Sequence, residues 1–416
     1  MNLREDAHAL QGDLVELRRT LHAAPETGLR LPRTQETVLS GLDGLGLEIT
    51  TGQGLSSVTA VLRGARPGPT VLLRGDMDAL PVTERTNLPY ASGNGAMHAC
   101  GHDLHTAMLC GAARLLARHR DHLAGDVVFM FQPGEEGFHG ARHMIDEGLL
   151  QTTGTLPVAA YALHVTSSEY RSGRFTARSG PLMAAANTLS VTVRGAGGHG
   201  SAPHRAKDPV QVACETVMAL QTWITRAFDV FDPVVLSVGS FHAGTQQNII
   251  PETATFEATV RAFSHTAQAR LKDGTVQVCR GVAAAHGVDV DVRFDELYPV
   301  TVNDARETDF VRRTVADLHG EERYEHMPHP MTGSEDFSLV IDEVPGAMVF
   351  LGATAPGADP DTAPDNHSPL AVFDEAVLAD GAALYARLAV DRLAAEHTQH
   401  TDTDTDTERT GQGVRR

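Results

Sequence analysis

Cysteine and basic side chains are both scarce in this sequence, and each shortage argues against a class of protein. Only four of the 416 residues are cysteines, namely Cys100, Cys110, Cys214 and Cys279. They are too few and too scattered for a disulfide framework or for the paired cysteines of a structural zinc site. Lysine and arginine number 34 against 53 aspartates and glutamates, a formal net charge of −19. Because nucleic-acid phosphates attract basic patches, this balance argues against a nucleic-acid partner.

Long apolar segments are missing as well. No run approaches the ~20 residues needed to span a bilayer, so we expect no membrane partner. The N-terminal stretch MNLREDAHALQGDL (1–14) carries charges where a signal peptide needs an apolar segment. We therefore expect a cytoplasmic protein with reduced cysteines. No serine stands in a G-x-S-x-G pattern, which argues against a serine hydrolase of the nucleophile-elbow type.

Strands alternate with helices in the first part of the chain and again near its end. Short apolar runs predict strands at 57–64, 70–78, 126–137, 158–165 and 347–353, and helical spacing predicts helices at 36–45, 106–120 and 373–396. Such runs, rich in valine, leucine and phenylalanine, are typical of buried strands in a mostly parallel sheet. The sequence therefore predicts an α/β fold.

The middle of the chain has a different order of elements. It reads as a strand at 187–195, a helix at 209–228, strands at 233–244 and 252–263, a helix at 265–287 and a strand at 288–294. This order is typical of a ferredoxin-like α+β unit. Because alternation resumes after about residue 300, we expect a catalytic domain of residues 1–185 and 299–396, interrupted by an inserted domain of residues 186–298. The polar, repetitive segment 397–416 is expected to be a disordered tail.

Polar side chains gather where the predicted parallel strands end. These residues are Asp76, Asp78, Glu135, Glu136 and His164, joined by Cys100, His102, Asp103 and His105 from a loop that precedes a helix. In open α/β sheets, sites form beyond the carboxyl ends of the strands. A thiolate, imidazoles and carboxylates together indicate a transition-metal site.

The role of Cys100 follows from its neighbours. A lone buried cysteine is usually a small hydrophobic residue, which is our interpretation of Cys110 and Cys279 on apolar helix faces. Cys100 instead lies in MHACGHDLHTA (97–107), among histidines and without apolar periodicity. This setting favours a metal ligand.

The adjacent pair Glu135–Glu136 follows QPG in a tight turn. Neighbouring residues in such a turn point in different directions, so one carboxylate can bind a metal while the other faces a substrate. Adjacent glutamates are usually a solvated surface, but their position directly after an apolar strand favours the functional interpretation.

A glycine-rich loop, RGAGGHGSAPH (194–204), matches the spacing G-x-G-x-x-G through Gly195, Gly197 and Gly200. A dinucleotide fingerprint should open a helix at its third glycine, yet the helical pattern begins only near residue 209. No acidic residue at a strand end follows to contact a ribose. We therefore expect these glycines to let a loop carrying His199 approach another surface closely.

Seven motifs occur in order between about residue 10 and residue 395. They are RGDMDALP (74–81), MHACGHDLHTAML (97–109), FQPGEEG (131–137), ALHV (162–165), GGHGSAPH (197–204), NIIPETA (248–254) and GSEDFS (333–338). Together they closely resemble the aminoacylase/carboxypeptidase family of two-metal amidohydrolases. The resemblance is to the branch of hippurate hydrolase and the indole-acetyl-amino-acid hydrolases.

The resemblance implies a metal-binding catalytic domain interrupted by a lid or dimerisation domain. It implies a homodimer and two divalent ions per chain, manganese or zinc. Carried over residue by residue, the metal ligands would be Cys100, His102, Glu136, His164 and His367.

Further roles follow from the same resemblance. Glu135 would be the general base, and Asp78 would orient a ligand. His199 would stabilise the oxyanion, in this family commonly in the partner subunit's site, and Asn248 would contact the substrate. Family members often carry asparagine where Val165 stands here, which we expect to affect substrate choice. They usually have leucine directly before the late histidine, whereas in this sequence Asp365–Asn366 precede His367.

We therefore expect hydrolysis of N-acyl amino acids, hippurate-like or N-acetyl, to a carboxylate and a free amino acid. Within the family, an N-acetyl-diaminopimelate deacetylase or a dipeptidase is the alternative. A dehydrogenase is supported by the glycine loop alone. A non-catalytic metal-binding or peptide-binding relative is disfavoured because Glu135 and all the candidate ligands are present. The sequence leaves open the acyl group, the amino acid, its stereochemistry and the metal.

Overall fold

The computed structural model describes residues 1–410, with side chains described through residue 396. Its chain divides into two compact units. The first comprises Met1–Gly180, Val302–Pro328 and Leu339–Arg416, and the second comprises Pro181–Thr301 and His329–Ser338. Each is described separately below.

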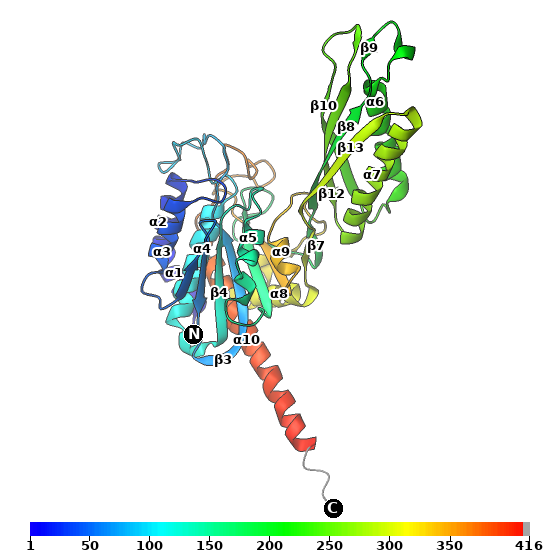
Figure 1. Ribbon diagram of the computed structural model, residues 1–416. Helices are drawn as coiled ribbons and strands as arrows, with labels where there is room; N and C mark the ends of the chain where they lie inside the picture. The colour runs from blue at the N-terminus through cyan, green and yellow to red at the C-terminus, as the bar shows by residue number, and fades with distance from the viewer. Residues whose placement is uncertain (411–416) are drawn as a thin grey trace, which may run out of the picture. The chain divides into compact units, whose positions relative to one another are not determined.

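The first unit is built on an eight-stranded sheet in the order β1-β2-β4-β3-β5-β16-β6-β15. Figure 1 labels its central strands β3 and β4. Its strands are β1 (Glu48–Thr51), β2 (Val58–Leu62), β3 (Arg66–Asp76), β4 (Ala124–Gln132), β5 (Ala159–Thr166), β6 (Phe175–Ala177), β15 (Tyr324–His326) and β16 (Gly346–Gly352). The four central strands, β4, β3, β5 and β16, run parallel to one another. Every residue of β5 and β16 is buried, as expected for strands covered on both faces. The predicted α/β fold with a mostly parallel sheet is confirmed.

Helices of the first unit pack on this sheet and on one another. They are α1 (Leu3–Ala9), α2 (Gln11–Ala23), α3 (Pro32–Leu42), α4 (His102–Arg118), α5 (Gly140–Asp146), α8 (Ala305–His319), α9 (Ser338–Ile341) and α10 (Val377–Thr410), with a short strand β14 (Thr301–Asn303). Helices α4 and α10 pack against each other and against β3, and α2 packs on α4. Gly111 permits this approach, because a Cβ there would lie 2.9 Å from the Cβ of Ala382 on α10. The close α4–α10 packing fixes the helix that follows the cysteine–histidine loop.

The second unit has a four-stranded antiparallel sheet in the order β10-β12-β8-β13. Its elements are β7 (Gly180–Met183), β8 (Ala185–Arg194), β9 (Gly198–His199), α6 (Pro209–Ala227), β10 (Val234–Ala243), β11 (Ile249–Ile250), β12 (Thr253–Ala262), α7 (His265–His286) and β13 (Asp289–Tyr298). Helices α6 and α7 pack side by side on the sheet (Figure 1). Asp208 and Ser264 cap their N-termini by accepting bonds from Val210 N and Ala267 N. The strand-helix-strand-strand-helix-strand order expected from the sequence is present.

The limits of the units differ from the expected domain limits, and the last helix extends further than expected. The second unit spans residues 181–301 where 186–298 was expected, and it also takes in residues 329–338. Helix α10 runs to Thr410, into the segment 397–416 for which the composition predicts disorder. Residues 411–416 of that segment lie outside the described residues, and its disorder stays a prediction.

Within the described residues, the structure has no helix long and apolar enough to cross a membrane.

A buried charged network ties α2 to the start of α4. The Nε atom of Arg18 lies 2.7 Å from Asp103 Oδ2, and both side chains are essentially inaccessible to solvent. His22 Nδ1 lies 2.7 Å from the same oxygen. Burial alone would raise the pKa of Asp103, but the charges of Arg18 and His22 hold it far below its usual range. Asp103 is therefore a buried carboxylate whose charge depends on these partners.

Replacing Arg18 by leucine should lower the free energy of unfolding by about 3–5 kcal/mol, because it leaves the Asp103 charge buried and short of a partner. Its neighbour Arg19 provides a matched control, since that side chain is 48% exposed and pairs with Glu375. Arg19→Leu should cost no more than about 1 kcal/mol. Urea unfolding of both variants measures the difference, and equal losses would contradict the importance of the buried pair.

Candidate active site

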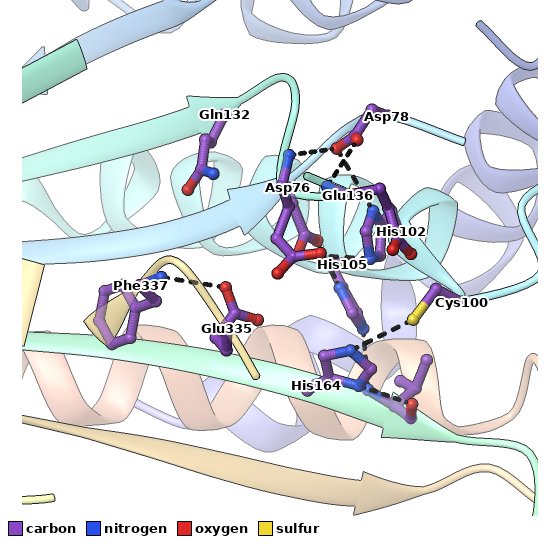
Figure 2. Close-up of polar contacts among 12 residues, drawn as sticks. Asp76, Asp78, Cys100, His102, His105, Gln132, Glu136, His164, Glu335 and Phe337 are labelled. Atoms are coloured by element: carbon purple, nitrogen blue, oxygen red, sulfur yellow. Dashed lines mark hydrogen bonds and ion pairs between the residues drawn. The ribbon is translucent and has the colours of Figure 1, made fainter. Parts of the chain in front are cut away.

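The carboxyl ends of three adjacent parallel strands supply part of one cluster of polar side chains. Strand β3 ends at Asp76 and is followed by Asp78, and β4 ends at Gln132 and leads into the turn that carries Glu135 and Glu136. Strand β5 carries His164 near its end. Because β4, β3 and β5 are neighbours in the sheet, these ends lie together, as Figure 2 shows for the labelled residues.

Cys100 and His102 join the cluster from the loop before α4. Gly101 stands between them in the left-handed conformation, with φ = 83°. A side chain there would collide with Cγ2 of Val165. Glycine therefore lets the backbone turn sharply at the start of α4, so that the residues on both sides of it face the same cluster.

The thiol of Cys100 lies at the centre of the cluster. Its Sγ atom is 3.5 Å from His164 Nε2 and 3.3 Å from His367 Nε2. Two ligands of one ion, each ~2.0–2.3 Å from it, lie about 3.1–3.6 Å apart. The distance from the thiol to each histidine therefore fits a pair of ligands to one metal ion.

Two groups of potential ligands share this thiol. Ligand atoms of Cys100, His102 and His164 all lie within 4.8 Å of one another, and so do those of Cys100, Glu136 and His367. The same limit also holds for His102, Glu135 and Glu136. The arrangement offers two neighbouring positions for ions with one sulfur atom between them. Sulfur, imidazole and carboxylate donors together suit zinc or manganese.

Buried polar atoms without a hydrogen bond also suit a metal at this cluster. Among the described residues, nothing hydrogen-bonds to the buried ring nitrogens of His102 or to Oε1 of Glu136. Charged groups lie near these atoms: Asp78 is 3.5 Å from His102 Nδ1, Asp76 is 3.5 Å from His102 Nε2, and His367 is 3.2 Å from Glu136 Oε1. A buried polar atom without a hydrogen bond costs roughly 1–3 kcal/mol, and coordination to a cation would offset that cost. The residues present therefore fit the metal that the sequence predicts.

The charges in the cluster depend on one another. Burial alone would raise the pKa of Cys100, but the charges of His164 and His102 hold it well below its usual range. Close contacts with Cys100 and Glu136 raise the pKa of His367 to about 10. Burial raises the pKa of Glu136, and the negative charge of the nearby thiolate raises it further. A cation that binds here must displace the histidine protons, so metal binding and proton release are coupled.

Asp78 holds the glutamate turn in place. Its Oδ1 accepts a hydrogen bond from Glu135 N at 3.0 Å, and its Oδ2 accepts one from Glu136 N at 3.1 Å. The same carboxylate faces His102 Nδ1 (Figure 2). This geometry supports the orienting role that the sequence suggests for Asp78.

Asp76 and His105 form a buried pair beside the cluster. His105 Nε2 accepts a hydrogen bond from Val165 N at 2.8 Å, so Nδ1 carries the proton that is donated to Asp76 Oδ1 at 2.5 Å. The second Asp76 oxygen accepts from Arg74 at 2.7 Å. The sequence pattern places Asp76 and His105 among the polar residues of the predicted metal site. In the structure, their hydrogen bonds support the end of β5, which carries His164.

The late histidine, His367, reaches the cluster from the loop after β16. Its φ is 71°, a conformation that costs a non-glycine residue ~1–3 kcal/mol. Its backbone N donates to Ala99 O at 2.8 Å, one residue before Cys100. The strained backbone thus brings His367 to the thiol, although this residue lacks the leucine that usually precedes it in the family.

His199 and Asn248 lie next to each other in the second unit. Gly200 N donates to Asn248 O at 2.8 Å, and β9 pairs with β11 at His199 and Ile249. His199 is exposed, and its Nδ1 accepts a bond from Ser201 N at 3.1 Å. In the neutral ring, Nε2 therefore carries the proton and can act as a donor. The glycine loop forms β9 and not a helix, in agreement with the argument against a dinucleotide site.

The other cysteines differ from Cys100. Cys110 and Cys279 are buried, and burial raises the pKa of each thiol to about 12. Both match the interpretation as small hydrophobic residues. Cys214 is exposed.

Comparison with known proteins agrees with the geometry of the cluster. Residues 72–391 match the model of "Peptidase family M20/M25/M40". Thermostable carboxypeptidase 1 of Saccharolobus solfataricus is 36% identical over 393 residues, covering 93% of this chain and 97% of the relative. Hippurate hydrolase of Campylobacter jejuni is 34% identical over 394 residues, covering 94% and 100%.

The solved structure of the YXEP protein of Bacillus subtilis superposes on this chain with a TM-score of 0.79. That protein is described as a dinuclear metal binding peptidase from the M20 family. It is 31% identical, and the match covers 93% of this chain and 99% of that one. The aminoacylase/carboxypeptidase resemblance seen in the motifs is thereby confirmed. This chain belongs to peptidase family M20/M25/M40 and is a hydrolase of that family.

Proposed function

We propose that this protein is a metal-dependent amidohydrolase that cleaves N-acyl amino acids to a carboxylate and a free amino acid. The observation that carries the proposal is the Cys100 thiol, which two groups of ligand atoms share, together with the buried Glu135, which lies close to ligand atoms of His102 and Glu136. Its relation to hippurate hydrolase supports an acyl amino acid as the substrate class.

The ligands would be divided between two divalent ions, zinc or manganese. Cys100, His102 and His164 would hold one ion, and Cys100, Glu136 and His367 would hold the other. When bound, the ions would polarise the amide carbonyl and lower the pKa of a water molecule.

Glu135 would act as the general base. It is buried, and its backbone is fixed by Asp78, which places its carboxylate within 4.8 Å of ligand atoms of His102 and Glu136. Its carboxylate would take a proton from the attacking water and deliver it to the departing amine nitrogen. A carboxylate in this place can act as the base in the first step and, once protonated, as the acid in the second.

His199 and Asn248 would act on the substrate, as the resemblance of their motifs implies. The Nε2–H group of His199 would donate a hydrogen bond to the oxyanion that forms as the amide carbonyl is attacked. Asn248 would contact the substrate.

The main alternative is a related amide substrate. A dipeptide fits the same chemistry, and the relation to a carboxypeptidase favours it over an N-acetyl-diaminopimelate derivative.

A relative without catalytic activity would bind metal but hydrolyse none of these compounds. A cytoplasmic location stays a prediction.

We also propose that the protein is a homodimer that associates through the second unit. Strand β10 is the last strand of its sheet, so one backbone edge has no partner in the described chain. In the loop before it, Val230 is 81% exposed and Phe231 is 93% exposed. An open edge with large apolar side chains beside it is a typical protein–protein contact.

Replacing Glu135 by glutamine should lower kcat by about 10²–10⁴-fold and leave bound metal unchanged, because it removes the base and no ligand. Glu136→Gln is the matched control and should lose metal. Steady-state kinetics and metal analysis of both variants test this assignment. Metal loss in the Glu135 variant, with metal kept in the Glu136 variant, would show that the two roles are reversed.

Replacing Cys100 by serine should remove most of the bound metal, since both ligand groups contain that thiol. Cys110→Ser changes a buried cysteine whose raised pKa keeps it a neutral thiol, and it should retain the metal. Elemental analysis after dialysis gives the metal content of each. Full metal content in the Cys100 variant would exclude the thiolate as a ligand.

If His199 acts in the partner subunit's site, mixing a Glu135→Gln variant with a His199→Ala variant should restore activity through hybrid dimers. One site of each hybrid would then have an intact Glu135 and an intact His199. Mass measurement of differently tagged subunits verifies exchange. Proven exchange without recovered activity would show that His199 does not act across the dimer.

A further inference from the structure

Asn366 lies directly before His367, and its side chain is locked in one orientation. Its Oδ1 accepts a hydrogen bond from Ser167 N at 2.9 Å. A backbone N–H can only donate, so this face of the amide must be the oxygen. The Nδ2 group is therefore directed to the opposite side.

On that side, Nδ2 of Asn366 contacts the segments that carry two metal-ligand candidates. It donates to Val165 O at 3.0 Å and to Cys100 O at 3.3 Å, and it lies 3.7 Å from Cys100 Sγ. Val165 O also accepts the Nδ1 proton of His164 at 2.9 Å. One amide thus contacts the thiol directly, reaches His164 through a shared acceptor, and precedes His367 in the chain.

We propose that Asn366 is a positioning residue that sets the geometry and charge of the shared thiolate. The inference rests on the metal centre of the proposed function. One Nδ2 proton points to Val165 O, and the other is shared between Cys100 O and Cys100 Sγ. A proton shared in this way withdraws negative charge from the sulfur and fixes the direction of its lone pairs. The acceptor Val165 O determines that Nδ1 of His164 carries a proton, and Nε2 faces the thiol.

The role differs from ordinary loop support, because both Nδ2 protons are used on ligand-bearing segments. Ser167 and Pro364 already hold the two loops together through a bond from Ser167 Oγ to Pro364 O at 2.8 Å. That bond does not involve Asn366. Removing the Asn366 amide should therefore change the metal centre more than it changes the fold.

The test uses two variants of the full-length protein, Asn366→Asp and Asn366→Ala. The first keeps the shape but puts an acceptor against Val165 O and the thiolate, and the second removes the side chain. Asn303→Asp is the matched control, because Asn303 is a buried asparagine that bonds to the backbones of Arg178 and Met348. Among the described residues, its hydrogen bonds involve none of the ligand candidates.

Apo protein is titrated with Co²⁺ or Cd²⁺, with calorimetry for affinity and near-ultraviolet absorption for the thiolate-to-metal charge-transfer band. Both Asn366 variants should bind the metal roughly 10–100-fold more weakly and shift that band, whereas Asn303→Asp should change neither. Circular dichroism of each variant verifies folding, and the alanine variant decides the matter if the aspartate variant does not fold.

The outcomes separate this inference from the proposed function. If the unmodified protein binds no metal and shows no thiolate band, the metal centre itself is wrong, and the inference is overturned with it. If the unmodified protein binds metal and the Asn366 variants match it in affinity and in band position, Asn366 is only a loop contact, and the proposed function stands without it.

Discussion

The buried thiolate of Cys100 is the constraint on which the rest of the site depends. A buried negative charge is costly unless positive partners lie close to it. Here, the charges of His164 and His102 offset its burial, and His367 lies 3.3 Å away on another side. Without metal, these imidazoles take the place of cations. With metal, they become ligands and release their protons. The nitrogen atoms around the sulfur therefore offset its charge without metal and bind the ion with it.

The fold delivers these groups by elementary rules of parallel sheets. Strands β4, β3 and β5 end at one edge, so the polar residues that follow them meet there. Rigid supports then hold each group in place, including Asp78 beneath the glutamate turn and the Asp76–His105 pair beside β5. Further away, the buried Arg18–Asp103 pair fixes the first turn of α4. One of the strained backbone positions lies at the site itself, at His367 with φ = 71°.

Much of this arrangement can be predicted from the sequence, because it follows from local patterns. Polar residues directly after apolar strands reveal Asp76, Glu135 and Glu136, and a cysteine amid histidines reveals the ligand loop. His367 could be placed only by resemblance, since a long irregular loop carries no periodicity that fixes its direction. The Arg18–Asp103 pair joins residues far apart in the sequence, and residues 329–338 join the second unit from outside its main span. Such long-range contacts depend on packing, which no local pattern encodes.

The metal content per chain and the release of product should be measured on the same preparation, because together they test whether Cys100 and its neighbours form a metal-dependent active site. Bound metal is counted, and amino-acid release from N-acetyl, N-benzoyl and indole-acetyl amino acids is followed after chelation and after adding back Mn²⁺ or Zn²⁺. The account predicts about two ions per chain, loss of release on chelation and its return with metal. Absence of bound metal under every condition would contradict the account, because Cys100 and its histidines would then have no ion to hold.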